Sequence, residues 1–185
     1  NENSRLYPAS PYGVSKVFAH KTAQHYREAY DMFISCGILF NHESPLRGLE
    51  FVTKKITSAV ARIKANKQDK LYLGNIKAKR DWGYAGDYVK AMWLMLQQKK
   101  SSDYVIATNE SHSVEDFLIE AFEYSGLGDW KKYVEIDKKL IRPQDIDNLI
   151  GDANKAKKEI RWEPTVQYKD LVKMMVDDDL KLLEK

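Results

Sequence analysis

A tyrosine and a lysine stand four residues apart near the start of this 185-residue chain, in the stretch SPYGVSK at 10–16. If this stretch opens a helix, Tyr12 and Lys16 lie side by side on one face. An ammonium group close to a phenol favours the phenolate and lowers the pKa of the phenol from about 10 towards neutrality. Such a tyrosine can take a proton from an alcohol while a hydride leaves the same carbon, as oxidation by a nicotinamide requires. The same spacing also fits two ordinary helix residues, because the chain holds 11 tyrosines.

The spacing of apolar residues predicts that helices and strands alternate along the chain. Helical periodicity covers 12–30, 51–65, 86–97, 113–124, 153–160 and 168–183, and short apolar runs at 32–39, 71–73, 104–107 and 133–136 are typical of strands. The run 32–39 is expected to be buried on both faces. The helix over 86–97 is expected to turn Val89, Met92, Trp93 and Leu96 inwards. This alternation predicts an α/β fold with right-handed crossovers, in which the end of a parallel sheet precedes a smaller mixed unit.

Composition and charge exclude several classes of function. The net charge of +3 is spread along the chain, so no basic face for nucleic acid is expected. No segment is apolar enough to cross a membrane, and the start of the chain lacks a signal-peptide core. Cys36 is the single cysteine, so no intrachain disulfide is possible, which favours the cytoplasm. It lies in an apolar run and is expected to be a buried, inert thiol. His20, His25 and His112 have no partners at metal-ligand spacing, so no metal site is predicted.

Several sequence blocks, taken together, resemble one enzyme family. The stretch YPASPYGVSKVFAHK resembles the active-site helix of the extended short-chain dehydrogenase/reductases, which work on nucleotide sugars. The blocks NHESPLRG at 41–48, AKRDWG at 78–83 and RPQD at 142–145 narrow this resemblance to the GDP-mannose 4,6-dehydratases. The resemblance extends from about residue 7 to residue 183. It implies that residues 1–40 are the remnant of an NADP-binding Rossmann domain with most of that dinucleotide-binding domain missing, and that 41–185 mainly bind the GDP-sugar, with some segments returning to the Rossmann domain.

The resemblance also implies roles for individual residues. Tyr12 and Lys16 would be catalytic, and the expected contacts of the cofactor NADP are Tyr12, Lys16, Leu39, His42 and Arg47. The expected contacts of GDP-mannose are Asn41, Val52, Lys55, Arg80, Arg142 and Asp145. On sequence alone, Lys54, Lys55 and Arg80 also fit solvated surface charges, and Trp82, Trp93 and Trp162 fit packing residues.

Arg47 resembles the arginine that reaches the NADP phosphate of a neighbouring subunit, since a guanidinium matches a phosphate with two donors. The family commonly has two adjacent arginines at this point, and this chain has Leu46 before Arg47. The resemblance implies a homo-oligomer, a dimer or tetramer, built partly on the helix over 12–30.

The implied reaction converts GDP-mannose to GDP-4-keto-6-deoxymannose and water, with a hydride taken from carbon 4 of the mannose by NADP and returned to carbon 6. No glycine-rich turn for a pyrophosphate follows a predicted strand, so the chain is expected to be the C-terminal portion of such an enzyme and to be inactive alone. Two alternatives stay open: a related nucleotide-sugar reductase or epimerase, and a non-catalytic module for GDP-sugar binding or subunit interaction.

Overall fold

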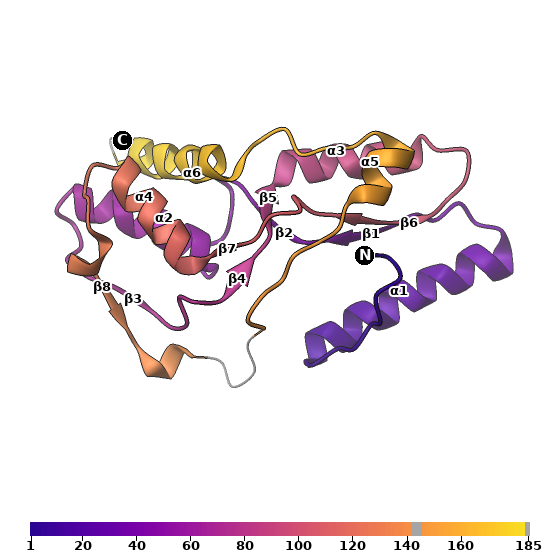
Figure 1. Cartoon of the computed structure of the whole chain (residues 1–185), viewed down its shortest axis with the longest axis horizontal. Coiled ribbons are helices and arrows are strands. Elements are labelled where there is room, and N and C mark those ends of the chain that lie inside the picture. The colour runs from indigo at the N-terminus through magenta and orange to yellow at the C-terminus, as the bar shows by residue number, and fades with distance from the viewer. Residues whose placement is uncertain (142–145, 184–185) are drawn as a thin grey trace.

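Helices and strands alternate in the computed structural model, which describes residues 1–141 and 146–183 (Figure 1). The helices are α1 (Pro11–Tyr30), α2 (Val52–Lys64), α3 (Ala85–Leu96), α4 (Val114–Tyr124), α5 (Asn154–Ile160) and α6 (Tyr168–Leu183). The strands are β1 (Cys36–Leu39), β2 (Asn41–Glu43), β3 (Leu71–Leu73), β4 (Lys79–Arg80), β5 (Trp82–Tyr84), β6 (Asp103–Ile106), β7 (His112–Ser113) and β8 (Val134–Ile136). The predicted α/β fold is confirmed, and the predicted helices agree with the observed ones to within about two residues, as expected for helix ends.

The strands pair two by two. β1 pairs with β6, β2 with β5 and β3 with β8, each in parallel, whereas β4 and β7 are antiparallel. Phe40 alone separates β1 from β2, so the two strands form one nearly continuous line that meets β6 first and then β5. This line carries the chain from the side of the molecule where α1 lies, at the right of Figure 1, towards the helices α2, α4 and α6 at the left.

A first apolar core lies among α2, α4 and α6. Helical spacing places apolar residues from each helix on its inner face, and Ile56, Phe117, Phe122, Leu171 and Met175 are fully buried there. At about 25 cal/mol for each Å² of apolar surface removed from water, this burial is the main force that holds the three helices together. The core is closed on the sheet side by β3, β8 and Trp82.

A second, smaller core lies behind β6. Its buried members are Tyr88, Ala91, Met95, Tyr104, Val105, Ile106, Ala107, Ala153, Ala156, Ile160 and Trp162. They come from α3, β6 and α5 and from residues that directly flank β6 and α5, so this core covers one side of the β1–β6 pair.

Two predictions about this second region are wrong. The run 32–39 forms a strand only from Cys36 to Leu39, and that strand is half-buried rather than buried on both faces. The inner face of α3 consists of Asp87, Tyr88, Ala91 and Met95. Val89, Met92, Trp93 and Leu96, predicted to point inwards, are between 41% and 61% exposed. The helix is apolar on both sides, so periodicity alone did not identify the buried one.

Local sequence signals fix the ends of α4. Ser113 accepts a hydrogen bond from the Asp116 amide, and the Asp116 carboxylate accepts one from the Ser113 amide, which is a complete capping box. Gly126 follows the helix at a φ of 82°, a left-handed conformation that glycine adopts without a Cβ clash.

Buried carboxylates join elements that are far apart in sequence. The Asp81 side chain, which is fully buried, accepts hydrogen bonds from the amides of Thr108, Asn109 and Gly151 and from the Thr108 hydroxyl. Asp87 at the start of α3 likewise accepts from the amides of Thr165 and Val166. Because a buried carboxylate is stable only when it is paired or hydrogen-bonded, these contacts define where each loop must lie.

Candidate functional site

The predicted catalytic residues lie in the first turns of α1. Ser10 caps this helix by accepting a hydrogen bond from the Gly13 amide at 3.1 Å, and Pro11 occupies the first helical position. The Lys16 ammonium nitrogen lies 5.3 Å from the centroid of the Tyr12 ring. Tyr12 is 71% exposed. The structure therefore places the two side chains next to each other on an open face of the helix.

Leu39 and His42 flank the end of β1. Leu39 is its last residue and lines a groove of about 200 Å³ together with Ser35, Gly37, Met92, Met95 and Leu96. The Nδ1 atom of His42 lies 2.8 Å from the Phe40 carbonyl oxygen. A carbonyl only accepts hydrogen bonds, so Nδ1 carries a proton and Nε2 is the nitrogen left for another partner. The carboxyl end of a parallel strand is where open α/β sheets bind ligands.

A buried tyrosine supports the imidazole of His42. The Tyr88 ring lies 5.0 Å from the His42 ring, centroid to centroid, and meets the Trp162 ring edge-on at 5.9 Å. Burial raises the pKa of the Tyr88 hydroxyl, so that group stays protonated. Asn41 stands next to His42 in β2 and is opposite Trp82 of β5 in the register.

The loop after β2 is organised by Glu43, which the sequence interpretation missed. Glu43 is only 2% exposed; it accepts a hydrogen bond from the Thr53 hydroxyl at 2.7 Å and forms an ion pair with Nε of Arg47 at 3.0 Å. Burial raises the pKa of the Glu43 carboxyl, against the opposing effects of Thr53 and Arg47. The Arg47 guanidinium also lies over the Phe51 ring, 3.4 Å from its centroid. The loop thus holds Arg47 against the start of α2.

Val52 and Lys55 lie in the first two turns of α2, and both are half-buried. The first amide groups of a helix point outwards unpaired and carry partial positive charge, which favours an anion at this end. Lys54 between them is not a solvated charge, because its ammonium lies 2.8 Å from an Asp179 oxygen and donates to the Pro45 carbonyl. A signal for this existed in the sequence, since Asp179 continues the apolar spacing of Leu171 and Met175 on α6.

Arg80 comes from a different part of the sheet. It lies in β4, opposite His112 of β7, and its Nη1 atom donates to the carbonyls of Lys79 and Ile146. Arg142 and Asp145, the other two residues predicted to bind the substrate, lie outside the described residues. The segment from β2 to the second turn of α2 therefore carries Asn41, His42, Arg47, Val52 and Lys55. Arg80 lies on a neighbouring strand pair, β4 and β7.

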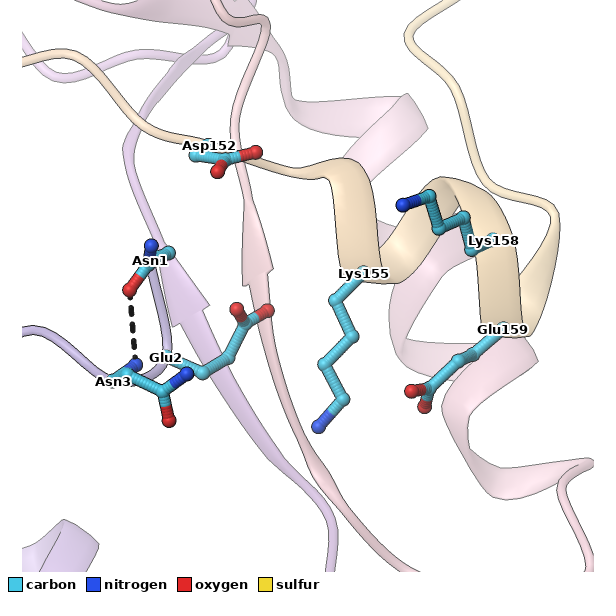
Figure 2. A pocket seen from close by; sticks show the side chains of 7 residues that line it. All are labelled: Asn1, Glu2, Asn3, Asp152, Lys155, Lys158 and Glu159. Atoms are coloured by element: carbon cyan, nitrogen blue, oxygen red, sulfur yellow. Dashed lines mark hydrogen bonds between the residues drawn. The ribbon is translucent and has the colours of Figure 1, made fainter.

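A cavity of about 370 Å³ elsewhere in the molecule does not coincide with these residues (Figure 2). It lies between the first residues of the chain and α5, and its lining residues are Asn1, Glu2, Asn3, Asp152, Lys155, Lys158 and Glu159. The Glu2 carboxylate accepts a hydrogen bond from the Val105 amide, and Lys155 donates to the Ser102 hydroxyl. Glu2 and Lys155 are thus engaged with β6 and the residue before it, and the sequence motifs point to the α1, β2 and α2 region instead.

Residues 1–141 and 146–183 contain neither a cluster of metal ligands nor a helix suited to a membrane. No group of three or more histidine, cysteine, aspartate or glutamate side chains there is arranged to hold a metal ion. None of the helices there combines the length and the apolar character that crossing a bilayer requires.

Comparison with solved structures defines the class of fold. The structure of RMD from Pseudomonas aeruginosa complexed with NADPH superposes with a TM-score of 0.89, covering 98% of this chain and 60% of that chain at 18% identity. A dTDP-glucose 4,6-dehydratase from Bacillus anthracis in complex with NAD gives a TM-score of 0.87, covering 100% of this chain and 56% of that chain at 23% identity. At such identities the likeness concerns the fold alone. This chain has part of the Rossmann-type α/β fold of these proteins.

The family follows from sequence. The family model described as GDP-mannose 4,6 dehydratase matches residues 1–175, and the chain belongs to this family. GDP-mannose 4,6 dehydratase 2 of Arabidopsis thaliana is 58% identical over 185 residues, which are 100% of this chain and 49% of the relative. The human GDP-mannose 4,6 dehydratase is 44% identical over 198 residues, covering 98% of this chain and 53% of the relative. The chain thus spans about half the length of the curated relatives it matches.

Proposed function

We propose that this chain supplies the substrate-binding part and the tyrosine–lysine pair of a GDP-mannose 4,6-dehydratase. The observation that carries the proposal is the neighbouring placement of Tyr12 and Lys16 at the start of α1, in a chain that is 58% identical throughout to a plant GDP-mannose 4,6 dehydratase. The same observation favours a dehydratase over a reductase or epimerase, because it joins the pair to family-specific sequence along the whole chain. We further propose that 1–40 belong to the cofactor domain and 41–185 mainly to the sugar-nucleotide side.

The residues present fit one end of a nicotinamide dinucleotide. When bound, NADP would accept a hydride from the sugar and return it. Tyr12 would take and give back the proton of the sugar hydroxyl, and Lys16 would hold the phenol oriented and donate to a ribose hydroxyl. His42 would meet the cofactor through Nε2, since its Nδ1 is committed to Phe40. Leu39 would contact the apolar part of the cofactor from the end of β1.

Arg47 would use only part of its guanidinium for a phosphate. Nε lies 3.0 Å from the Glu43 carboxylate, and the two terminal nitrogens are the donors that bidentate contact with a phosphate needs. If that phosphate belongs to the NADP of a second subunit, the protein is a homo-oligomer, a dimer or tetramer, in which this loop takes part.

GDP-mannose would lie along β2, the start of α2 and β4. Asn41 and Val52 would contact the sugar nucleotide, and the α2 N-terminus with Lys55 and Arg80 would balance the diphosphate charge. Arg142 and Asp145 complete this proposal from sequence. Such an enzyme would work in the cytoplasm, where nucleotide sugars are handled.

The test is a chimera that joins this chain to the part of the Arabidopsis relative outside the match, assayed for conversion of GDP-mannose with NADP. Activity is expected in the chimera, and Tyr12→Phe should reduce kcat by about 10²- to 10⁴-fold, the usual contribution of a general acid–base. The matched control is Tyr30→Phe, an exposed tyrosine at the other end of α1, which should leave kcat unchanged. Equal losses in the two variants would overturn the proposed role of Tyr12.

Binding is tested separately from chemistry. Arg80→Ala and Arg142→Ala in the same chimera should each weaken GDP-mannose binding by about 10-fold or more while the urea midpoint moves little, since a lost charge-assisted hydrogen bond costs about 1.5–3 kcal/mol. Lys90→Ala, an exposed cation of α3, is the control for a general change of charge. If the midpoint falls as far as the affinity, these arginines are structural and the proposed site is wrong.

A further inference from the structure

The helix that carries Tyr12 and Lys16 is attached to the rest of the molecule by polar contacts. All residues of α1 are exposed or half-buried, and Phe18 in its middle is 73% exposed. Five of the seven half-buried residues, Gly13, Val17, His20, Gln24 and Arg27, recur at steps of three and four, so they form one face. Three side chains of this face, those of His20, Gln24 and Arg27, converge on a single carboxylate.

That carboxylate is Asp103, the first residue of β6. Both terminal nitrogens of Arg27 lie 2.8 Å from Oδ1 of Asp103, and the Gln24 amide donates to Oδ2 at 2.7 Å. His20 Nε2 lies 3.6 Å from Oδ2. Burial opposes the charged form of Asp103, but the hydrogen bonds from Arg27 and Gln24 outweigh it and lower the pKa of the carboxyl. Asp103 is thus an ionised acceptor shared by three successive turns of α1.

The anchor is itself fixed on the side of the sheet. Asp103 is opposite Cys36 in the parallel β1–β6 register. The Lys155 ammonium of α5 donates to the Asp103 carbonyl at 2.8 Å and to the Ser102 hydroxyl at 2.6 Å. Arg27 donates in addition to the Ile34 carbonyl at 3.0 Å, which ties the end of the helix to the segment that leads into β1. The carboxylate therefore has a defined position from which to orient α1.

The lengths of α1 and of the β1–β2 line show where the contact at Asp103 places the start of the helix. From Arg27 back to Tyr12 the helix rises about 22 Å, at about 1.5 Å per residue. Seven residues of strand cover about the same length, at about 3.3 Å per residue. α1 runs against the direction of β1 and β2 (Figure 1). Counting seven residues from Cys36 reaches Glu43, so a helix held at Asp103 brings Tyr12 level with Asn41, His42 and Glu43 of β2.

We infer that Asp103 is a positioning residue: by binding Arg27, Gln24 and His20 it sets the direction of α1 and so fixes how far along the line of β1 and β2 the side chains of Tyr12 and Lys16 lie. The anchoring itself does not depend on the proposed function, and only the consequence for Tyr12 and Lys16 as catalytic groups rests on it. The experiment is chosen to report on α1 whether or not the protein turns over a substrate.

The test measures the position of α1 in this chain by double electron–electron resonance between spin labels at Val14→Cys and Tyr72→Cys, in a Cys36→Ser background. Both labelled positions are more than half exposed. The parent should give a single narrow distance peak, which Asp103→Ala should lose. The charge exchange of Asp103→Arg with Arg27→Asp should restore it, and Asp69→Ala, a change at an exposed aspartate, should keep it.

Hydrogen exchange, measured on the unlabelled chain with Cys36 intact, separates an effect on the position of α1 from an effect on folding. In Asp103→Ala, amide protection in α1 should fall about tenfold or more, the effect of losing charge-assisted hydrogen bonds, while α4 and α6 keep theirs. Unchanged α1 protection with an unchanged distance peak would overturn the inference. So would equal loss in α1, α4 and α6, or a charge exchange that restores nothing. A chimera without dehydratase activity would leave all of these readouts intact and would count against the proposed function alone.

Discussion

The two ends of this molecule bury their apolar residues to very different degrees. In the region of α2, α4 and α6, apolar side chains from all three helices meet in one closed core, and Phe117 is 0% exposed. In the region of α1, β1 and α3, a second core covers one side of a strand pair, while Phe18 is 73% and Trp93 61% exposed. The first region is complete within this chain, and the second presents apolar faces that resemble an interior surface more than an exterior one.

This difference bears on where stability and function lie. Burial supplies most of the free energy of folding, so the closed core should determine global stability. The second region holds Tyr12, Lys16, Leu39 and His42, and its helix α1 is attached by polar contacts such as those of Asp103. Four comparisons test this contrast, and they follow in order of decreasing expected effect.

The largest contrast is expected from one substitution made in both regions. Phe117→Ala should lower the free energy of unfolding by about 4 kcal/mol, because it removes a buried ring and leaves a cavity. Phe18→Ala should change it by less than about 0.5 kcal/mol, because that ring is already in water. Urea unfolding followed by circular dichroism measures both. Similar losses would mean that the α1 face is covered in solution by another surface.

The Asp81 carboxylate should be the next most important group. Asp81→Asn keeps the shape of the side chain but replaces one carboxylate oxygen by an NH2 group, which cannot accept the hydrogen bonds that the backbone amides of the loops donate. It should therefore lower the free energy of unfolding by about 3 kcal/mol. The control is Asp69→Asn, an exposed aspartate, with an expected change below about 0.5 kcal/mol. Urea midpoints give the comparison. An equal response would show that the buried hydrogen bonds of Asp81 contribute little.

The reactivity of the Cys36 thiol tests whether β1 is stably formed within the region of α1, β1 and α3. Burial, with Asp103 nearby, raises the pKa of this thiol to about 11 from an ordinary value of 9.0. Only the thiolate reacts, so at pH 8 modification by a disulfide reagent should be about 100-fold slower than in urea. The rate should rise with pH until about 11 in the folded chain. A midpoint near 9 would show that β1 opens freely.

Removing helix caps should give the smallest effect and sharpen the contrast further. Ser113→Ala breaks the capping box of α4 and should cost about 1 kcal/mol of global stability. Ser10→Ala removes the cap of α1, which has no buried side chain to transmit the loss. Its urea midpoint should stay constant, and only the exchange of α1 amides should accelerate, by about fivefold. A similar fall in the urea midpoints of Ser113→Ala and Ser10→Ala would show that the two regions do not respond independently.

Sequence patterns predicted the fold class and the helices well because these depend on local periodicity and caps. Burial was predicted less well. Trp82 and Trp162 are packing residues as predicted, but Trp93 is exposed, since α3 is apolar on two sides. No sequence pattern marked the carboxylates of Glu43 and Asp81 as buried, because donors that stabilise them, such as the Thr53 hydroxyl and the amides of Thr108 and Gly151, come from other segments of the chain.

The sequence by itself determined the family blocks, the alternation of helices and strands and the four-residue spacing of Tyr12 and Lys16, because each is a property of neighbouring residues. Only the tertiary structure decided which face of α3 is buried, that Lys54 pairs with Asp179, and that three side chains of α1 meet at Asp103. These contacts join residues up to 125 positions apart (54 to 179), and no local pattern encodes which distant partner each side chain reaches.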